Sequence, residues 1–297
     1  MRWKRDVPLA LHARYGIGGP AARFGTPCSI VELRGAIESL SGGPYRVLGA
    51  GANVLVSDDG VVEPVFVLGG ELDFVHAHPD AIEAGAAARL PALVGMARRE
   101  SRVGFSFLEA VPGTVGGGLR MNAGSREVWL WHRVQWVEAM TPEGEVVRLD
   151  PEDAGAGYRS VAIPESWVFV GGRFDAPEGD GTAIQEEHQT FRARKVGDQV
   201  YELPSIGSTW KNPGPQHGSA WEIVDRVGMR GARRGDAQIA QHHTNFIVNL
   251  GKARAEDVLA LMIETRRRAH ETLGVWLEPE ICMWGFELAQ LEQVGAK

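Results

Sequence analysis

Residues 108–124 read Leu108-Glu109-Ala110-Val111-Pro112-Gly113-Thr114-Val115-Gly116-Gly117-Gly118-Leu119-Arg120-Met121-Asn122-Ala123-Gly124. Five glycines fall among the last twelve of these residues, and glycine lets a backbone bend sharply or approach another group closely. Thr114, Asn122 and the backbone N–H groups of such a loop can donate to an anion such as a pyrophosphate. The alternative is a glycine-rich turn between packed strands, because short motifs often match by chance.

A second glycine loop, Gly49-Ala50-Gly51-Ala52-Asn53, favours ligand binding, since two such loops could converge on one long phosphate-bearing molecule. Neither loop matches the common nucleotide signatures. Gly117-Gly118-Leu119 lacks the lysine of a Walker loop, and the first loop is followed by the strand-like Val54-Leu55-Val56 where a dinucleotide fingerprint requires a helix. We therefore expect strand-connecting loops, and not a helix N-terminus, to hold the pyrophosphate.

Length and composition indicate a soluble protein of two or three lobes. The chain has 297 residues, of which 44% are hydrophobic and 23% charged, and its net charge of −7 argues against broad nucleic-acid binding. Two cysteines, Cys28 and Cys282, are too few for a disulfide framework and favour a reducing compartment. Residues 1–10 lack the apolar core of a signal peptide, and no segment approaches the roughly 20 apolar residues of a membrane span. We expect a cytoplasmic location.

The hydrophobic pattern predicts an α+β chain. The clearest helix covers 255–273, where Glu264 and Arg268 are spaced as an i,i+4 ion pair and Gly274 follows as a helix terminator. The other predicted helices cover 29–40, 91–98, 182–195 and 220–227, and the predicted strands cover 45–48, 54–56, 61–68, 73–83, 134–138, 145–149, 167–174, 239–250 and 275–277.

Three side chains outside the glycine loops are candidates for chemistry. Ser208 follows a glycine and offers a hydroxyl proton donor, but a Gly-x-Ser-x-Gly hydrolase motif is absent. Arg159 could clamp a carboxylate in bidentate fashion. Pro279 restricts Glu278 to an extended backbone and lets Glu280 project in a fixed direction. The competing interpretations are a turn serine, an arginine that caps backbone carbonyls and a surface pair of acids.

The nine histidines do not form a recognisable metal site. His242 and His243 are adjacent, so that on a strand they point to opposite faces. His76 and His78 share a face but lack accompanying carboxylate or cysteine ligands. We therefore predict no metal, and we expect His243 and Asn245, which share a face, to reach a ligand together.

Six stretches in the same order resemble the UDP-N-acetylenolpyruvoylglucosamine reductases, the MurB family of flavoenzymes. Together they extend over nearly the whole chain. They are Ile17-Gly18-Gly19-Pro20-Ala21, Leu48-Gly49-Ala50-Gly51-Ala52-Asn53, Val111-Pro112-Gly113-Thr114-Val115-Gly116-Gly117 with Met121-Asn122-Ala123-Gly124, Tyr158-Arg159-Ser160, Gly207-Ser208 with Lys211-Asn212-Pro213, and Leu277-Glu278-Pro279-Glu280.

The resemblance implies an α+β fold: a two-lobed FAD-binding fold of the MurB/vanillyl-alcohol-oxidase type plus an α/β substrate-binding domain. The expected divisions are 1–69 with 276–297 as the first FAD-binding lobe, 70–200 as the second lobe and 201–275 as the substrate-binding domain. The compact middle lobe suggests the shorter subtype, which lacks the long loop that closes over substrate.

The resemblance also implies the chemistry. NADPH would reduce a non-covalent FAD and leave before the substrate, UDP-N-acetylglucosamine enolpyruvate, enters the same cleft. Hydride would pass to C3 of the enolpyruvyl group and a proton to C2, which gives UDP-N-acetylmuramate for peptidoglycan precursor synthesis. Ser208 would donate the proton, while Arg159 and Glu280 would stabilise the enolic intermediate.

Further site residues follow from the same matches. FAD would be bound by Gly49, Ala50, Gly51, Ala52, Asn53, Pro112, Gly113, Thr114, Gly116, Gly117, Asn122 and Ala123, and the substrate by Tyr158, Lys195 and Asn212, together with His243 and Asn245. The expected partner is the small UDP-sugar, with no nucleic acid or membrane, and the chain is expected to be a monomer.

Two other functions remain open. One is an FAD-dependent oxidase or dehydrogenase that uses the same scaffold for another substrate. The other is a flavin-binding relative without turnover, which is suggested because Cys282 or Met283 stands where the family has an arginine shortly after the final glutamate.

Overall fold

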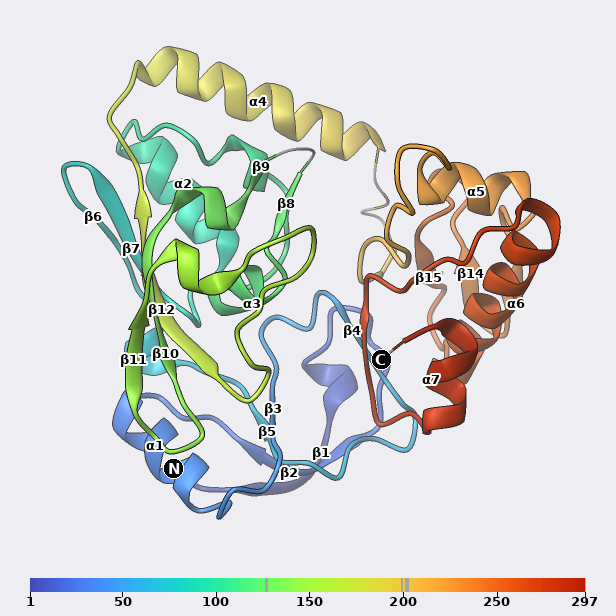
Figure 1. The fold of residues 1–297 in the computed structure, drawn as a ribbon, viewed down its shortest axis with the longest axis horizontal. Coiled ribbons are helices and arrows are strands. Elements are labelled where there is room, and N and C mark those ends of the chain that lie inside the picture. The colour runs from blue at the N-terminus through green and yellow to red at the C-terminus, as the bar shows by residue number, and fades with distance from the viewer. Residues whose placement is uncertain (126–127, 199, 201–202, 297) are drawn as a thin grey trace. The chain divides into compact units, whose positions relative to one another are not determined.

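The computed structural model describes residues 1–125, 128–198, 200 and 203–296 (Figure 1). By its internal contacts the chain divides into two compact units. The first unit comprises Met1–Arg5, Arg23–Ala50 and Glu63–Gly197, and the second comprises Asp6–Ala22, Gly51–Val62 and Asp198–Lys297. The three-part division expected from the resemblance stays a prediction.

The first unit is built on a five-stranded antiparallel sheet of order β11-β10-β12-β7-β6. Its two faces are buried by different helices, because successive side chains of a strand point to opposite faces. Val168 and Val170 of β12 pack with α1, whereas Phe169 between them belongs to the core formed with α2 and α3. The elements are β6 (Val75–Ala77), β7 (Ala81–Gly85), β10 (Val134–Met140), β11 (Val146–Leu149), β12 (Val168–Asp175), α1 (Ile30–Glu38), α2 (Leu90–Arg99) and α3 (Val115–Arg120).

Smaller elements complete this unit. A four-stranded sheet has the order β1-β2-β5-β3, in which β5 pairs in parallel with β2 and β3; strands β1 and β2 each contribute residues to both units. The remaining elements are β1 (Lys4–Pro8), β2 (Pro20–Gly25), β3 (Arg46–Val47), β5 (Val65–Phe66), β8 (Gly124–Ser125), β9 (Val128–Trp129), α4 (Gly181–Asp198) and the 3₁₀ helices Gly70–Leu72, Ser106–Leu108 (η3), Leu130–Arg133 and Pro151–Ala154.

The second unit joins segments from both ends of the chain. A three-stranded antiparallel sheet lies with α5 and α6 around one core, and β4 pairs in parallel with β16. Asp58 accepts the N–H groups of Ala255 and Glu256, each at 3.0 Å, and thereby caps α6. The elements are β4 (Val54–Val56), β13 (Arg233–Arg234), β14 (Ala237–Ile239), β15 (Ile247–Asn249), β16 (Cys282–Trp284), α5 (Ala220–Arg226), α6 (Ala255–Leu273), α7 (Leu288–Val294) and the 3₁₀ helix Leu9–Leu11.

All five predicted helices are confirmed, and α6 has the predicted bounds. Glu264 accepts from Arg268 at 2.6 Å, and Gly274 follows the helix with φ of +69°. The predicted strand at 275–277 is wrong. Val275 and Leu277 are buried in the core of the second unit, and Trp276 stacks on His270 of α6, so that side-chain packing replaces a strand ladder.

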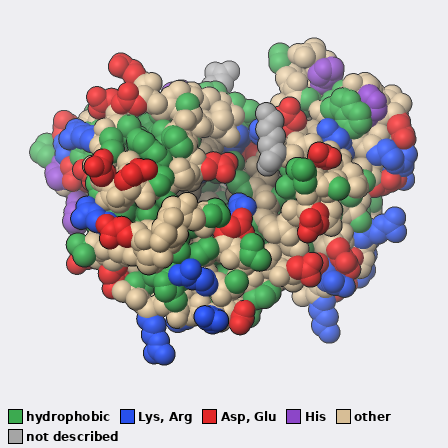
Figure 2. Space-filling model, turned by 60° about the horizontal axis from the view of Figure 1, so that its bottom comes forward, with side chains coloured by type: hydrophobic (Ala, Val, Ile, Leu, Met, Phe, Trp, Pro, Cys, Tyr) green, Lys and Arg blue, Asp and Glu red, His purple; other side chains and the backbone are tan. Residues whose placement is uncertain are grey.

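No described helix is both long enough and apolar enough to serve as a membrane span. On the face that Figure 2 shows, Lys and Arg side chains are scattered among Asp and Glu side chains.

The hydroxyl of Tyr15 is buried and finds no hydrogen-bond partner among the described residues. Burial raises the pKa of Tyr15 above its usual value. Because a buried polar group without a partner destabilises the folded state, Tyr15→Phe is expected to raise the free energy of unfolding by about 1 kcal/mol in urea titration.

The matched control for this prediction is Tyr45→Phe. The Tyr45 hydroxyl donates to the carbonyl of Ser166, so its removal is expected to lower stability. A Tyr15→Phe protein less stable than the parent would show that the Tyr15 hydroxyl has a favourable role.

Candidate active site

Ser208 and Glu280 are brought close together within the second unit. The segments that carry them form an antiparallel bridge, in which Trp210 pairs with Pro279. The Lys211 N–H donates to the Glu278 carbonyl at 2.9 Å, and the Glu280 N–H donates to the Thr209 carbonyl at 2.8 Å. Ser208 therefore directly precedes the residue that binds the Glu280 backbone.

The backbone of Glu280 is held from its other side by Asn53. The Asn53 Nδ2 donates to the Glu280 carbonyl at 3.0 Å, and the Asn53 carbonyl accepts from the Cys282 N–H at 2.9 Å. Both main-chain groups of Glu280 are thus occupied, and its half-buried side chain extends from a fixed backbone. Asn53, which was predicted to bind FAD, also supports the candidate catalytic acid.

Asn245 binds the segment 207–213 that carries Ser208, here called the serine segment. Its Oδ1 accepts from the Trp210 N–H and its Nδ2 donates to the Trp210 carbonyl, both at 2.9 Å, while the Asn245 carbonyl accepts from the Thr209 N–H at 2.7 Å. The side-chain amide is therefore engaged by the protein itself. Asn245 lies in a turn between β14 and β15, so the strand predicted to be continuous over 239–250 is wrong at this point. The sequence alone did not distinguish this backbone contact from a ligand contact.

Two other predicted substrate residues lie in the second unit. The Oδ1 of Asn212 accepts from the Ala220 N–H at 2.9 Å, which ties the serine segment to the start of α5. His243 is half-buried. Its Nδ1 accepts from the Asn245 N–H at 3.3 Å, and its ring centroid lies 4.8 Å from that of Phe246.

We had expected the glycine stretch of the first unit to be a strand-connecting loop. This expectation is wrong in part, because the stretch continues into the short helix α3. Thr114 is the N-cap residue, and its Oγ1 accepts from the Gly117 N–H at 3.3 Å. The N–H groups of Val115 and Gly116 donate to Ala88 and Ala86. A Cβ on Gly116 would lie 3.0 Å from that of Ala86, so this glycine serves close packing.

Backbone amides at both glycine loops nevertheless fit a phosphate-bearing ligand. Among the described residues, the N–H groups of Gly113 and Thr114 and those from Gly49 to Asn53 have no acceptor. Within the first unit the loops approach each other, since a Cβ on Gly49 would lie 2.6 Å from Thr114 Oγ1. Gly113 has φ of +142°, which favours glycine. Backbone N–H groups of this kind can bind an anion, and binding of the FAD pyrophosphate by these two loops stays a prediction.

Arg159 lies in the first unit in a left-handed backbone conformation, with φ of +54°. Its guanidinium donates to the carbonyls of Asn122 and Gly124 at 3.4 and 3.3 Å. Asn122 in turn donates from Nδ2 to the Gly157 carbonyl at 2.8 Å, so it supports the arginine loop. A strained backbone at a non-glycine residue is often found at functional sites. The meeting of Arg159 with Ser208 and Glu280 of the second unit stays a prediction.

Tyr158 and Lys195, two further substrate candidates, also belong to the first unit. Tyr158 is exposed, and its ring centroid lies 5.3 Å from the Arg159 guanidinium. Lys195 is buried on α4 and donates from Nζ to the Phe107 carbonyl at 3.0 Å. Burial, assisted by the charges of Arg159 and Arg194 and opposed by that of Glu109, lowers the pKa of Lys195 to about 8.

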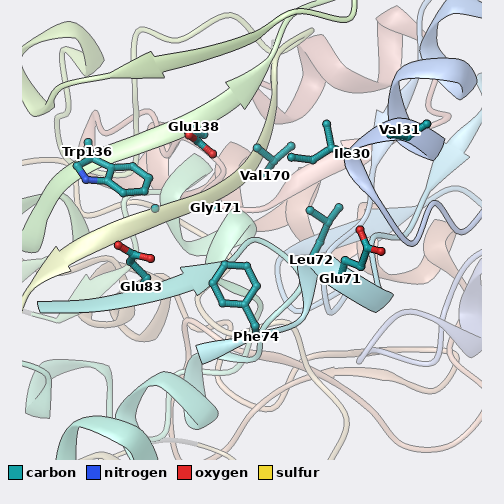
Figure 3. A pocket seen from close by; sticks show the side chains of 11 residues that line it. Ile30, Val31, Glu71, Leu72, Phe74, Glu83, Trp136, Glu138, Val170 and Gly171 are labelled. Atoms are coloured by element: carbon teal, nitrogen blue, oxygen red, sulfur yellow. The ribbon is translucent and has the colours of Figure 1, made fainter. Parts of the chain in front are cut away.

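A cavity of about 310 Å³ lies elsewhere in the first unit, on the sheet face next to α1 (Figure 3). Trp136 and Phe74 form its aromatic walls, and Glu83 and Glu138 also line it. It contains none of the predicted catalytic, cofactor or substrate residues, so it is distinct from the candidate site.

Two family models match the chain. An FAD binding domain matches residues 23–150, and the model "UDP-N-acetylenolpyruvoylglucosamine reductase, C-terminal domain" matches residues 199–284.

Curated relatives and a solved structure agree with these models. The UDP-N-acetylenolpyruvoylglucosamine reductase of Syntrophobacter fumaroxidans is 33% identical over 99% of this chain and 87% of the relative, and that of Methylococcus capsulatus is 36% identical over 95% and 93%. The crystal structure of the enzyme (MurB) from Thermus caldophilus superposes with a TM-score of 0.84 at 37% identity, covering 96% of this chain and 99% of that one.

Proposed function

Because the chain belongs to the family of UDP-N-acetylenolpyruvoylglucosamine reductases, we propose that Ser208, Arg159 and Glu280 are its catalytic residues. The chain is an FAD-dependent oxidoreductase with the MurB fold. It uses NADPH to reduce UDP-N-acetylglucosamine enolpyruvate to UDP-N-acetylmuramate, a step in peptidoglycan precursor synthesis. Its substrate is a small UDP-sugar.

The hydrogen bond between the Thr209 carbonyl and the Glu280 N–H carries the proposal, because it places a hydroxyl and a carboxyl group on adjoining segments. FAD, when bound, supplies the hydride that reaches C3 of the enolpyruvyl group. The Ser208 hydroxyl donates the proton that completes the reduction at C2.

Arg159 and Glu280 act on the charge that develops during this proton transfer. The guanidinium of Arg159 pairs with the substrate carboxylate as negative charge spreads onto it. Glu280, whose backbone is hydrogen-bonded to Thr209 and Asn53, presents its carboxyl group from a fixed position. Groups that are held in place beforehand need little reorganisation when charge develops.

The remaining site residues bind the two ligands. The amides of Gly113 and Thr114, and those of residues 49–53, bind the FAD pyrophosphate; Pro112, Gly116, Gly117, Asn122 and Ala123 shape the adjoining surface. Lys195 supplies positive charge for an anionic part of the substrate. Tyr158 and His243 contact the substrate, and Asn212 and Asn245 support the segment that carries Ser208.

Three broader statements belong to the same proposal. The functional divisions are 1–69 with 276–297 and 70–200 for FAD, and 201–275 for substrate. The enzyme acts as a monomer in the cytoplasm, where its precursor substrate is made. Size-exclusion chromatography with light scattering tests the monomer directly.

Purified protein is expected to be yellow, and its flavin absorbance is expected to bleach with NADPH under anaerobic conditions. Adding UDP-N-acetylglucosamine enolpyruvate then restores the absorbance. UDP-N-acetylglucosamine is the matched control, because it lacks the enolpyruvyl group and leaves the flavin reduced. A protein that takes up no FAD would refute the assignment.

The same measurement separates the two other functions. Reoxidation only by a different substrate would indicate an oxidase or dehydrogenase on this scaffold. A flavin that NADPH does not reduce and that no enolpyruvyl sugar affects would indicate a non-catalytic relative.

A further inference from the structure

The inward face of α4 carries two ionisable side chains at positions that usually hold apolar residues. Ile184, His188 and Lys195 are spaced to lie on one face of the helix, and all three are buried. His188 is only 1% exposed and Lys195 8% exposed. A buried ionisable side chain is costly unless it has a partner. The sequence pattern gave no signal for this face, because its inward residues are not uniformly apolar.

Both side chains make their contacts with η3 and the residue that follows it. His188 Nδ1 lies 2.9 Å from Glu109 Oε1, and Arg98 Nη1 lies 3.5 Å from the same oxygen. Lys195 Nζ donates to the Phe107 carbonyl at 3.0 Å. Glu109 is itself buried and stands four residues before Gly113 of the glycine loop. The helix that carries Lys195 is thus fastened to the segment that leads into that loop.

The charged side chains around Lys195 have opposite effects on its pKa. Burial and the cations Arg159 and Arg194 disfavour its ammonium form, whereas Glu109 favours it. Lys195 Nζ also has the neutral Phe107 carbonyl as an acceptor, but a carbonyl adds no net charge. Within the part of the chain described, Glu109 is the anion whose charge favours a protonated Lys195.

We infer that Glu109 and His188 are positioning residues that hold Lys195 in place and keep its amine protonated for an anionic group of the substrate. The inference rests on the proposed substrate-binding role of Lys195. His188 binds one carboxylate oxygen through Nδ1 and fixes the orientation of Glu109, while Arg98 contacts the same oxygen from α2. The carboxylate then acts on Lys195 through space, without a direct hydrogen bond to it.

The test measures the charge of Lys195 without any assay of activity. The chain contains five lysines, Lys4, Lys195, Lys211, Lys252 and Lys297, so ¹³C-NMR of protein labelled at the lysine Cε resolves each one, and Lys195→Met identifies the signal. Glu109→Gln is expected to lower the pKa of Lys195 by about one unit below the parent value.

Three further variants make the result specific. Arg194→Gln removes a neighbouring cation and is expected to shift the pKa in the opposite direction, upward. His188→Asn retains an N–H donor near the position of Nδ1 and is expected to keep the pKa within about 0.3 units of the parent, whereas His188→Ala lowers it. An unchanged pKa in Glu109→Gln, or shifts of the same sign in Glu109→Gln and Arg194→Gln, would overturn the inference. If Glu109→Gln does not fold, as judged by circular dichroism, the His188 pair decides the question.

The pH dependence of KM then separates this inference from the proposed function. In the parent enzyme, KM for the enolpyruvyl substrate should rise as the pH passes about 8, where Lys195 loses its proton. In Glu109→Gln the rise should begin about one pH unit lower. A shifted lysine pKa with an unshifted KM profile would uphold the control of Lys195 by Glu109 but remove Lys195 from the substrate site.

Discussion

Ser208→Ala is expected to slow reoxidation of the reduced flavin by the enolpyruvyl substrate by about 10²- to 10⁴-fold, the usual contribution of a general acid. Reduction of the flavin by NADPH should stay close to the parent rate, because that step requires no proton at C2. The bonds that shape the segment use the backbone of Thr209 and Trp210, so they survive the substitution. Anaerobic stopped-flow absorbance measures the two half-reactions separately.

Ser205→Ala is the matched control, because this buried serine lies three residues earlier in the same segment and has no proposed catalytic role. It should leave both half-reactions near the parent rates. Equal reoxidation rates in Ser208→Ala and the parent would remove Ser208 from the proton-transfer step.

The second large effect is expected for Glu280→Gln. The substitution removes the carboxyl group but keeps nearly the same shape, and should lower the rate of substrate reduction by about 10²- to 10³-fold. The hydrogen bonds to Thr209 and from Asn53 involve the Glu280 backbone, so they remain. The loss should therefore occur in kcat, with unchanged FAD binding and unfolding temperature.

Glu278→Gln serves as the control, because Glu278 lies two residues before Glu280 in the same segment. Glu278 is exposed, and its carboxylate lies 3.8 Å from Lys211 Nζ, a distance at which a surface ion pair contributes little to stability. This variant should keep kcat within about twofold of the parent, since no catalytic role is assigned to it. An equal loss of kcat in Glu280→Gln and Glu278→Gln would show that the reaction depends on the net negative charge of this segment. It would then not depend on the Glu280 carboxyl group specifically.

Local sequence signals predicted the long helices well, but they failed for an apolar segment that forms no strand and for a glycine-rich segment that forms a helix. The bounds of α6 were predicted because an apolar stripe, the Glu264–Arg268 pair and Gly274 all agree. Val275-Trp276-Leu277 has the apolar character of a strand, but its side chains pack beside α6 without a ladder. Likewise, α3 is a helix although three of its six residues are glycine, since the cap from Thr114 and the packing on Ala86 stabilise it.

The identities of the candidate catalytic residues came from motifs, whereas their arrangement depends on contacts between distant segments. The link from Thr209 to Glu280 joins positions whose pairing no local pattern indicates. Asn245 illustrates the same difficulty, because an amide can bind either a ligand or a backbone, and here it binds both main-chain groups of Trp210. The Glu109–His188 contact was missed because sequence periodicity reveals apolar faces and not buried polar pairs.

The parallel pairing of β4 with β16 limits how early this part of the protein can fold during its synthesis on the ribosome. Asn53 hydrogen-bonds to Glu280, which lies 227 residues later in the chain. The loop 51–53 therefore leaves the ribosome well before β16, the strand that pairs with β4, has been synthesised. Domains usually fold in the order of their synthesis, at about 5–20 residues per second, which leaves this loop incomplete for more than ten seconds. The hydrogen bonds that hold this loop to Glu280 and β16 therefore form only when translation is nearly finished.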